Sequence, residues 1–240
     1  MTEFIKAPVL YRPLIIGSMV MILRQFSGIN AVLGYCHWIF QTADIKDASL
    51  VSIIISITLI VFTLLSAVIV DKCGRRILLI LGGFSMFVMM LLLGLYFDIT
   101  VFGTPLEGQV TVFNHRTVPV SKISWLAVTC IITFISMYSL SWGPISWMLL
   151  GEFFSPKARG TAAAICNVVN WLATFLIMKF FPLMKDNLKD QGVFWFYAGS
   201  CLFSSFFTVF FVPETKGKTL EEIEDYFRNK SPKYNEYEKL

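Results

Sequence analysis

Ionisable side chains are scarce in this chain. Asp, Glu, Lys and Arg make up 15% of the 240 residues, whereas hydrophobic residues make up 56%. None of the 16 acidic residues lies deep inside a long apolar run, so the runs lack the carboxylates that carry protons in many pumps. This composition excludes an ordinary soluble domain and predicts an integral membrane protein.

Cysteine and histidine also lack the patterns of metal or redox sites. The five cysteines are scattered, and neither a CxxC pair nor a cysteine–histidine spacing typical of a metal site is present. We therefore expect no metal and no cofactor. The apolar runs contain no carboxylate pair and no nucleophile beside a base, so an enzyme is not expected. The net charge of +4 reflects basic residues between the runs, and no nucleic-acid partner is expected.

Six apolar runs are long enough to cross about 30 Å of hydrocarbon as helices. They lie near 13–40, 48–70, 77–97, 123–150, 160–184 and 193–212. We predict an all-α membrane protein with a lead-in at 1–12, a six-helix transmembrane bundle at 13–212 and a tail at 213–240. Most lysines and arginines lie on the side of the runs that holds both termini, which predicts that both termini are cytoplasmic.

The first run contains a polar stretch, Arg24 to Asn30, with the sequence RQFSGIN. A bilayer tolerates such groups only inside protein or a wet cavity, so the stretch indicates a solute path. Gln25 and Asn30 stand about 140° apart on an ideal helix, so they reach one cavity only if the helix is irregular at Gly28. Arg24 requires a partner, which could be an anionic group, a carboxylate or exposed carbonyls.

The fourth run is interrupted by Gly143 and Pro144. Proline removes one backbone donor, so the helix is expected to bend or unwind there. Trp147 follows this break. Its ring could stack on the C–H face of a sugar or serve as an interfacial anchor.

The fifth run carries Asn167, Asn170 and Trp171. The two carboxamides lie three residues apart on one helical face, and they offer donors and acceptors that suit neutral hydroxylated solutes. Hydrogen bonding between helices is the alternative.

The ends of the runs on the predicted cytoplasmic side are charged. Asp71, Arg75 and Arg76 belong to a turn between the second and third runs, and Glu152 and Arg159 bracket the turn after the fourth. Oppositely charged side chains at helix ends can hold neighbouring helices together and release them when they slide. Beyond the last run, a capping box at 219–222 predicts an amphipathic helix at about 220–229.

In order along the chain, these motifs resemble the C-terminal half of the sugar porter family of the major facilitator superfamily. The matching segments are RQFSGIN with Tyr35, then DKCGRR, GPISWMLLGEFFSPKARG, NVVNW and PETKGKTLEEIE. The resemblance implies facilitated diffusion of a hexose or disaccharide, such as glucose or trehalose, by alternating access in the plasma membrane. It also implies a partner, an N-terminal six-helix half that this chain does not contain.

The resemblance implies three groups of functional residues. The sugar-binding group is Gln25, Asn30, Trp147, Asn170 and Trp171, with Arg24, Tyr35 and Asn167 as further candidates. The helix breaks and the gate correspond to Gly28, Gly143 and Pro144. A cytoplasmic charge network that holds the outward-open state corresponds to Asp71, Arg75, Arg76, Glu152, Arg159 and Glu214.

The chain departs from the family pattern at four positions. Arg24 replaces the first of two adjacent glutamines, and the other departures are Gly34, Leu59 and Ser146. These changes leave a larger or partly anionic solute as an alternative cargo. A non-transporting half that acts as a sensor or regulatory partner is the other interpretation. We expect the chain to be a fragment, a shortened isoform or a genuine half-transporter.

Overall fold

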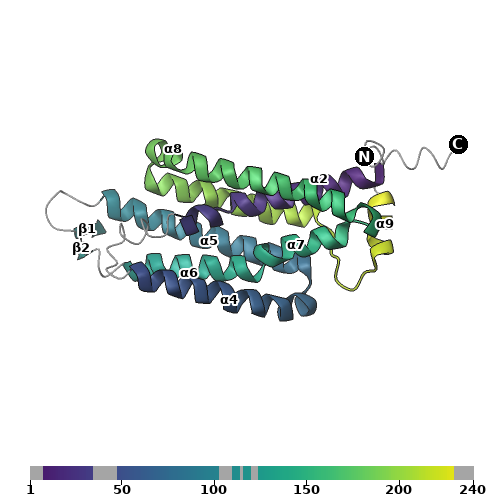
Figure 1. Cartoon of the computed structure of the whole chain (residues 1–240). Coiled ribbons are helices and arrows are strands. Elements are labelled where there is room, and N and C mark those ends of the chain that lie inside the picture. The colour runs from purple at the N-terminus through teal and green to yellow at the C-terminus, as the bar shows by residue number, and fades with distance from the viewer. Residues whose placement is uncertain (1–7, 35–47, 103–109, 114–115, 120–123, 230–240) are drawn as a thin grey trace.

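The computed structural model describes residues 8–34, 48–102, 110–113, 116–119 and 124–229. The long helices lie side by side in an elongated bundle, and the short α9 lies across one end (Figure 1). The helices are α2 (Pro8–Phe26), α4 (Ala48–Cys73), α5 (Arg75–Phe102), α6 (Ser124–Leu140), α7 (Trp142–Phe153), α8 (Pro156–Phe211) and α9 (Leu220–Asn229). A further helical stretch, 29–34, continues α2 beyond a break.

Five helical segments of the described chain are long and apolar enough to cross a membrane. The last of them, Ala158–Phe211, is 54 residues long because it contains two helices merged across a kink. The backbone is non-helical at Lys189 (φ 58°, ψ 173°), and Figure 1 shows α8 running to one end of the bundle and returning. α8 therefore supplies two antiparallel stretches, 156–188 and 190–211.

The prediction of an all-α membrane bundle is confirmed, with one small exception. Strands β1 (Val110–Phe113) and β2 (Arg116–Pro119) pair antiparallel in a short hairpin that the sequence analysis did not anticipate. They are the only strands among the described residues. The hairpin lies beyond the end of α5, at the end of the bundle opposite α9 (Figure 1).

The interior of the bundle is apolar and aromatic. Trp142 is fully buried, and its indole Nε1 donates a hydrogen bond to the carbonyl oxygen of Leu79 at 3.0 Å. Outside, α4 exposes a row of large aliphatic residues, Ile53, Ile57, Ile60, Leu64 and Val68. Exposing so continuous an apolar surface to water is unfavourable, so this face of α4 is suited to contact with lipid hydrocarbon.

The fourth apolar run forms two helices, with a break at Ser141 between α6 and α7. Pro144 explains the position of the break. Its ring would clash with the carbonyl of Leu140, four residues earlier, and proline has no backbone N–H to donate to that carbonyl. The Leu140 carbonyl oxygen instead accepts a hydrogen bond from the Ser66 hydroxyl at 2.8 Å. Gly143 and Pro144 lie in the first turn of α7, so the break precedes the two residues expected to contain it.

The helix expected after the last run is present as α9, with its capping box. The Thr219 N–H donates to Glu222 Oε2 at 3.0 Å, and the Glu222 N–H donates to Thr219 Oγ1 at 3.2 Å. Ile223 and Phe227 are buried, and the ring of Phe227 meets that of Phe153 edge to face at 5.5 Å. α9 is thus packed against the end of α7.

Candidate functional site

Three polar side chains of the first and fifth apolar runs form one hydrogen-bonded cluster, which we call the amide cluster: Gln25, Asn30 and Asn170. Gln25 Nε2 donates to Asn170 Oδ1 at 2.6 Å, and Asn30 Nδ2 donates to Gln25 Oε1 at 2.5 Å. Gln25 and Asn170 are each 2% exposed, whereas Asn30 is half-buried. The cluster joins α2, the helical stretch 29–34 and α8.

The cluster depends on the break at Gly28. α2 ends at Phe26, and Gly28 has φ +87°, a conformation that glycine adopts without strain. The left-handed residue changes the phase of the helix, so Asn30 reaches back to Gln25 instead of standing about 140° away as on an ideal helix. A Cβ atom at Gly28 would lie 2.6 Å from Cγ of Tyr197, so α8 also packs directly on the break.

Arg24 completes the site with a positive charge. Its NH1 donates to Asn170 Oδ1 at 3.1 Å, so this oxygen accepts hydrogen bonds from both Arg24 and Gln25. The guanidinium carbon lies 5.3 Å from the ring centre of Trp147 and 5.6 Å from that of Tyr138. These are cation–π distances, and the aromatic faces compensate part of the charge.

Tyr138 is the site residue that the sequence analysis missed. It lies nine residues before Trp147, which on a continuous helix corresponds to about 180° and would put the two rings on opposite faces. The break at Ser141 shifts the phase between α6 and α7, so both rings contact Arg24. The polar residues alone gave no signal of this arrangement.

The remaining candidates for the sugar site differ in how far their side chains are exposed. Trp147 is 41% exposed beside Arg24, and Trp171 is 64% exposed on α8. Asn167 is half-buried, and its Oδ1 is buried without a hydrogen-bond partner among the described residues. Tyr35 lies outside the described residues.

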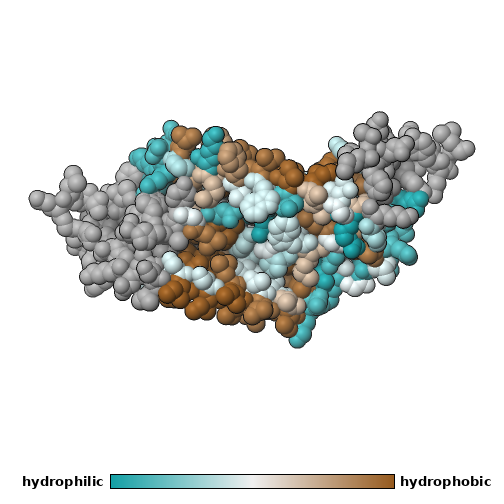
Figure 2. Space-filling view, viewed as in Figure 1, coloured by the Kyte–Doolittle hydropathy of each residue, from teal (hydrophilic) through white to brown (hydrophobic). Residues whose placement is uncertain are grey.

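Hydrophilic and intermediate residues gather at the centre of one face of the molecule, with hydrophobic residues along much of its edges (Figure 2). In the same view, Figure 1 shows α2, α7 and α8 towards the reader. These are the elements that carry Arg24, Trp147 and Asn170. Of these three residues, Trp147 is the most exposed and Asn170 is buried.

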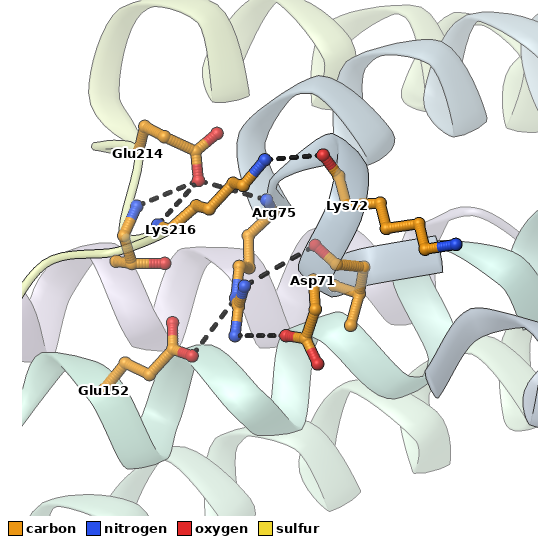
Figure 3. A network of polar contacts seen from close by, with 8 residues as sticks. Asp71, Lys72, Arg75, Glu152, Glu214 and Lys216 are labelled. Atoms are coloured by element: carbon orange, nitrogen blue, oxygen red, sulfur yellow. Dashed lines mark hydrogen bonds and ion pairs between the residues drawn. The ribbon is translucent and has the colours of Figure 1, made fainter. Parts of the chain in front are cut away.

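The second predicted group gathers at the end of the bundle beside α9, around Arg75 (Figure 3). Arg75 NH2 lies 3.1 Å from Asp71 Oδ1, and Arg75 Nε lies 3.2 Å from Glu152 Oε1. The largely buried guanidinium thus connects the end of α4, the start of α5 and the end of α7.

Glu214 joins this network through backbone rather than through a cation. Its carboxylate accepts hydrogen bonds from the backbone N–H groups of Arg75 and Arg76, both at 3.1 Å, and so caps the first turn of α5. Gly74, at φ +92°, makes room, because a Cβ atom there would lie 2.8 Å from Glu214 Oε2.

Two predicted members of the charge network contact carbonyls instead of carboxylates. Both Nε and NH2 of Arg159 lie 3.4 Å from the Phe154 carbonyl oxygen, and Arg76 NH2 donates to the Val209 carbonyl oxygen. Glu152 Oε2 is buried without a partner among the described residues. Within the described chain, the ion pairs of the predicted network are those of Arg75 with Asp71 and Glu152.

Comparison with known proteins identifies the family. Residues 1–227 match the family model described as "Sugar (and other) transporter". The chain belongs to this family. The resemblance inferred from the motifs is thereby confirmed.

The relatives and solved structures are transporters. The chain is 38% identical over 229 residues to the mouse (Mus musculus) solute carrier family 2, facilitated glucose transporter member 8, covering 94% of this chain and 48% of that protein. It is 36% identical over 216 residues to the facilitated trehalose transporter Tret1 of Bombyx mori, covering 89% of this chain and 40% of that protein. The chain therefore spans about half the length of these curated relatives or less.

The fold is also similar to that of solved sugar transporters. A double tryptophan mutant of XylE superimposes with a TM-score of 0.75 at 32% identity, covering 93% of this chain and 44% of that one. The inward-open conformation of the xylose transporter XylE from E. coli gives a TM-score of 0.70 at 32% identity, covering 90% of this chain and 42% of that one. The bundle has the fold of part of a major facilitator transporter.

Proposed function

We propose that the chain is the C-terminal half of a facilitative sugar carrier, which moves a hexose or disaccharide down its gradient by alternating access. The relatives named as glucose and trehalose transporters support a sugar as cargo. Alternating access requires two bundles around a central site, so the second wall is a six-helix half outside this chain. We place the carrier in the plasma membrane with both termini in the cytoplasm.

The amide cluster is the observation that carries this proposal. Gln25 and Asn170 use one hydrogen bond to fix each other's orientation, and Asn30 fixes Gln25 in turn. Asn170 Nδ2 and Asn30 Oδ1 make no hydrogen bond with the described residues, so the cluster keeps a donor and an acceptor for hydroxyl groups of a sugar. Trp147, partly exposed beside them, can stack on the C–H face of the ring.

The network around Arg75 serves as the gate on the cytoplasmic side in this proposal. It holds the ends of α4, α5 and α7 together and stabilises the outward-open state. Rocking of the two halves separates these helix ends and exposes the site to the cytoplasm. Gly28 and the break before Pro144 give the two helices that bear the site the freedom to follow this motion.

Sugar uptake by proteoliposomes tests the proposal. The chain is reconstituted together with the part of the Bombyx mori trehalose transporter that it does not cover, and saturable trehalose and glucose uptake is measured. Asn170→Ala removes an acceptor shared by two donors, so we expect uptake to fall about tenfold or more. Asn187→Ala is the matched control, because the Asn187 amide bonds only within its own helix end, to Leu183. Equal uptake by the two variants would contradict the proposed site.

A second candidate function is a regulatory half that does not transport. One observation favours it: Arg24 already occupies the acceptor of Asn170 and lies against Trp147, where a sugar would bind. Saturable uptake that depends on Asn170 would exclude this function.

A further inference from the structure

We propose that Arg24 makes this site selective for a sugar that carries one carboxylate, such as a hexuronate. This inference rests on the proposed function, since it assumes that the amide cluster binds a sugar. It replaces the neutral hexose or disaccharide with a monoanionic one as the preferred cargo.

The charge of Arg24 has no counter-charge in the described part of the chain. Its guanidinium contacts the neutral Asn170 oxygen and the faces of two aromatic rings. The ion pairs of Arg75 and Arg228 lie near α9 and do not include Arg24. A half-buried guanidinium at membrane depth is costly unless a partner or water compensates it, so a site that retains one is suited to an anion.

The geometry of the guanidinium suits a carboxylate. Arginine has five N–H donors in a planar fork, and one of them, on NH1, is used by Asn170. Its Nε is buried without a hydrogen-bond partner among the described residues, so the fork that can face a solute is formed by NH1 and NH2. A carboxylate can accept two parallel hydrogen bonds from such a fork, which are stronger than bonds between neutral groups.

The residues around Arg24 indicate which other chemical groups the solute should carry besides the carboxylate. The amide cluster lies on one side and offers partners for hydroxyl groups, while Trp147 offers an aromatic face for a ring. One guanidinium compensates one negative charge, so a doubly charged phosphate would bring an unpaired charge into a low-dielectric site. A ring with several hydroxyl groups and one carboxylate meets all three requirements.

Direct binding tests the inference. The chain is placed in nanodiscs of zwitterionic lipid together with the part of the Bombyx mori trehalose transporter that it does not cover, and binding of glucuronate, glucuronamide and glucose is measured by calorimetry and by quenching of tryptophan fluorescence. Glucuronamide keeps the size and polarity of glucuronate but lacks its charge. We expect glucuronate to bind about 10- to 100-fold more tightly than glucuronamide, the range of a charged hydrogen-bonded contact.

Two variants assign the effect to Arg24. Arg24→Gln restores the amide usual in the family and should abolish the preference for glucuronate while retaining glucose binding. Lys179→Gln removes one positive charge from an exposed position on α8 and should leave the preference unchanged. The preference should also survive moderate salt better than a contact at the surface would.

The other outcomes separate the two proposals. If Arg24→Gln binds glucose but the unaltered chain shows no preference for glucuronate, Arg24 blocks the sugar site: the inference is overturned and the sugar site stands. If no variant binds any of the three compounds, the inference is overturned and the proposed sugar site loses its support as well.

Discussion

Gly28 determines whether the polar residues of the first membrane helix can meet. Its φ of +87° costs an L-residue about 1–3 kcal/mol, and a Cβ atom would also collide with the Tyr197 ring. We expect Gly28→Ala to lower the melting temperature in detergent clearly and to weaken sugar binding. Gly199→Ala is the control, since its Cβ would meet nothing within 4 Å. Similar melting temperatures for the two variants would show that the break is not required for folding.

Individual residues differ in how far the sequence revealed their roles. The separation of Gln25 and Asn30 showed that the helix had to be irregular at Gly28 if they were to share a site, and the left-handed residue is there. The partners of Arg24 stayed open, because they come from α6, α7 and α8, which sequence spacing does not place relative to one another. Tyr138 was missed for the same reason.

At the scale of helices, Glu214 is the acid that α5 lacks in its own first turn. Its carboxylate accepts the backbone N–H groups of Arg75 and Arg76, where the helix dipole favours negative charge. Glu214→Gln keeps one acceptor oxygen but loses the charge, at a cost of about 1–2 kcal/mol. We expect hydrogen exchange at the start of α5 to accelerate roughly tenfold, which corresponds to about 1.4 kcal/mol.

Glu224→Gln is the matched control for this measurement, because it removes the same charge at an exposed position on α9. Unchanged exchange at the start of α5 in Glu214→Gln would show that the neutral amide caps the helix as well as the carboxylate does.

The helices themselves were easier to predict than their ends. Hydropathy located them, because a helix that crosses hydrocarbon needs about 20 apolar residues. It could not show that α4 continues through Asp71 and Lys72, or that α5 begins directly after Gly74, because charged residues at a membrane surface extend a helix without raising its hydropathy. The break before α7 lies at Ser141, two to three residues earlier than expected, because proline removes the hydrogen bond to the carbonyl four residues before it.

At the scale of the whole molecule, two sides of the bundle differ in polarity and therefore suit different environments. The exposed aliphatic row of α4 suits lipid, whereas the face with Arg24, Asn30 and Trp147 carries groups that lipid would leave unsatisfied. A second bundle over the polar face would enclose these groups in a wet cavity. The chain spans less than half of the mouse relative, and in the proposed function that bundle comes from outside the chain.

This asymmetry predicts that the chain transports only with a second half. Alone in proteoliposomes, it presents one wall of the site and cannot expose that site to each side of the membrane in turn. We expect saturable sugar uptake when the missing half of a relative is added, and background uptake with either half alone. Cross-linking should capture one copy of each half across the face that carries Trp147. Saturable uptake by the chain alone, together with cross-links between its own copies, would instead indicate that two copies form the carrier.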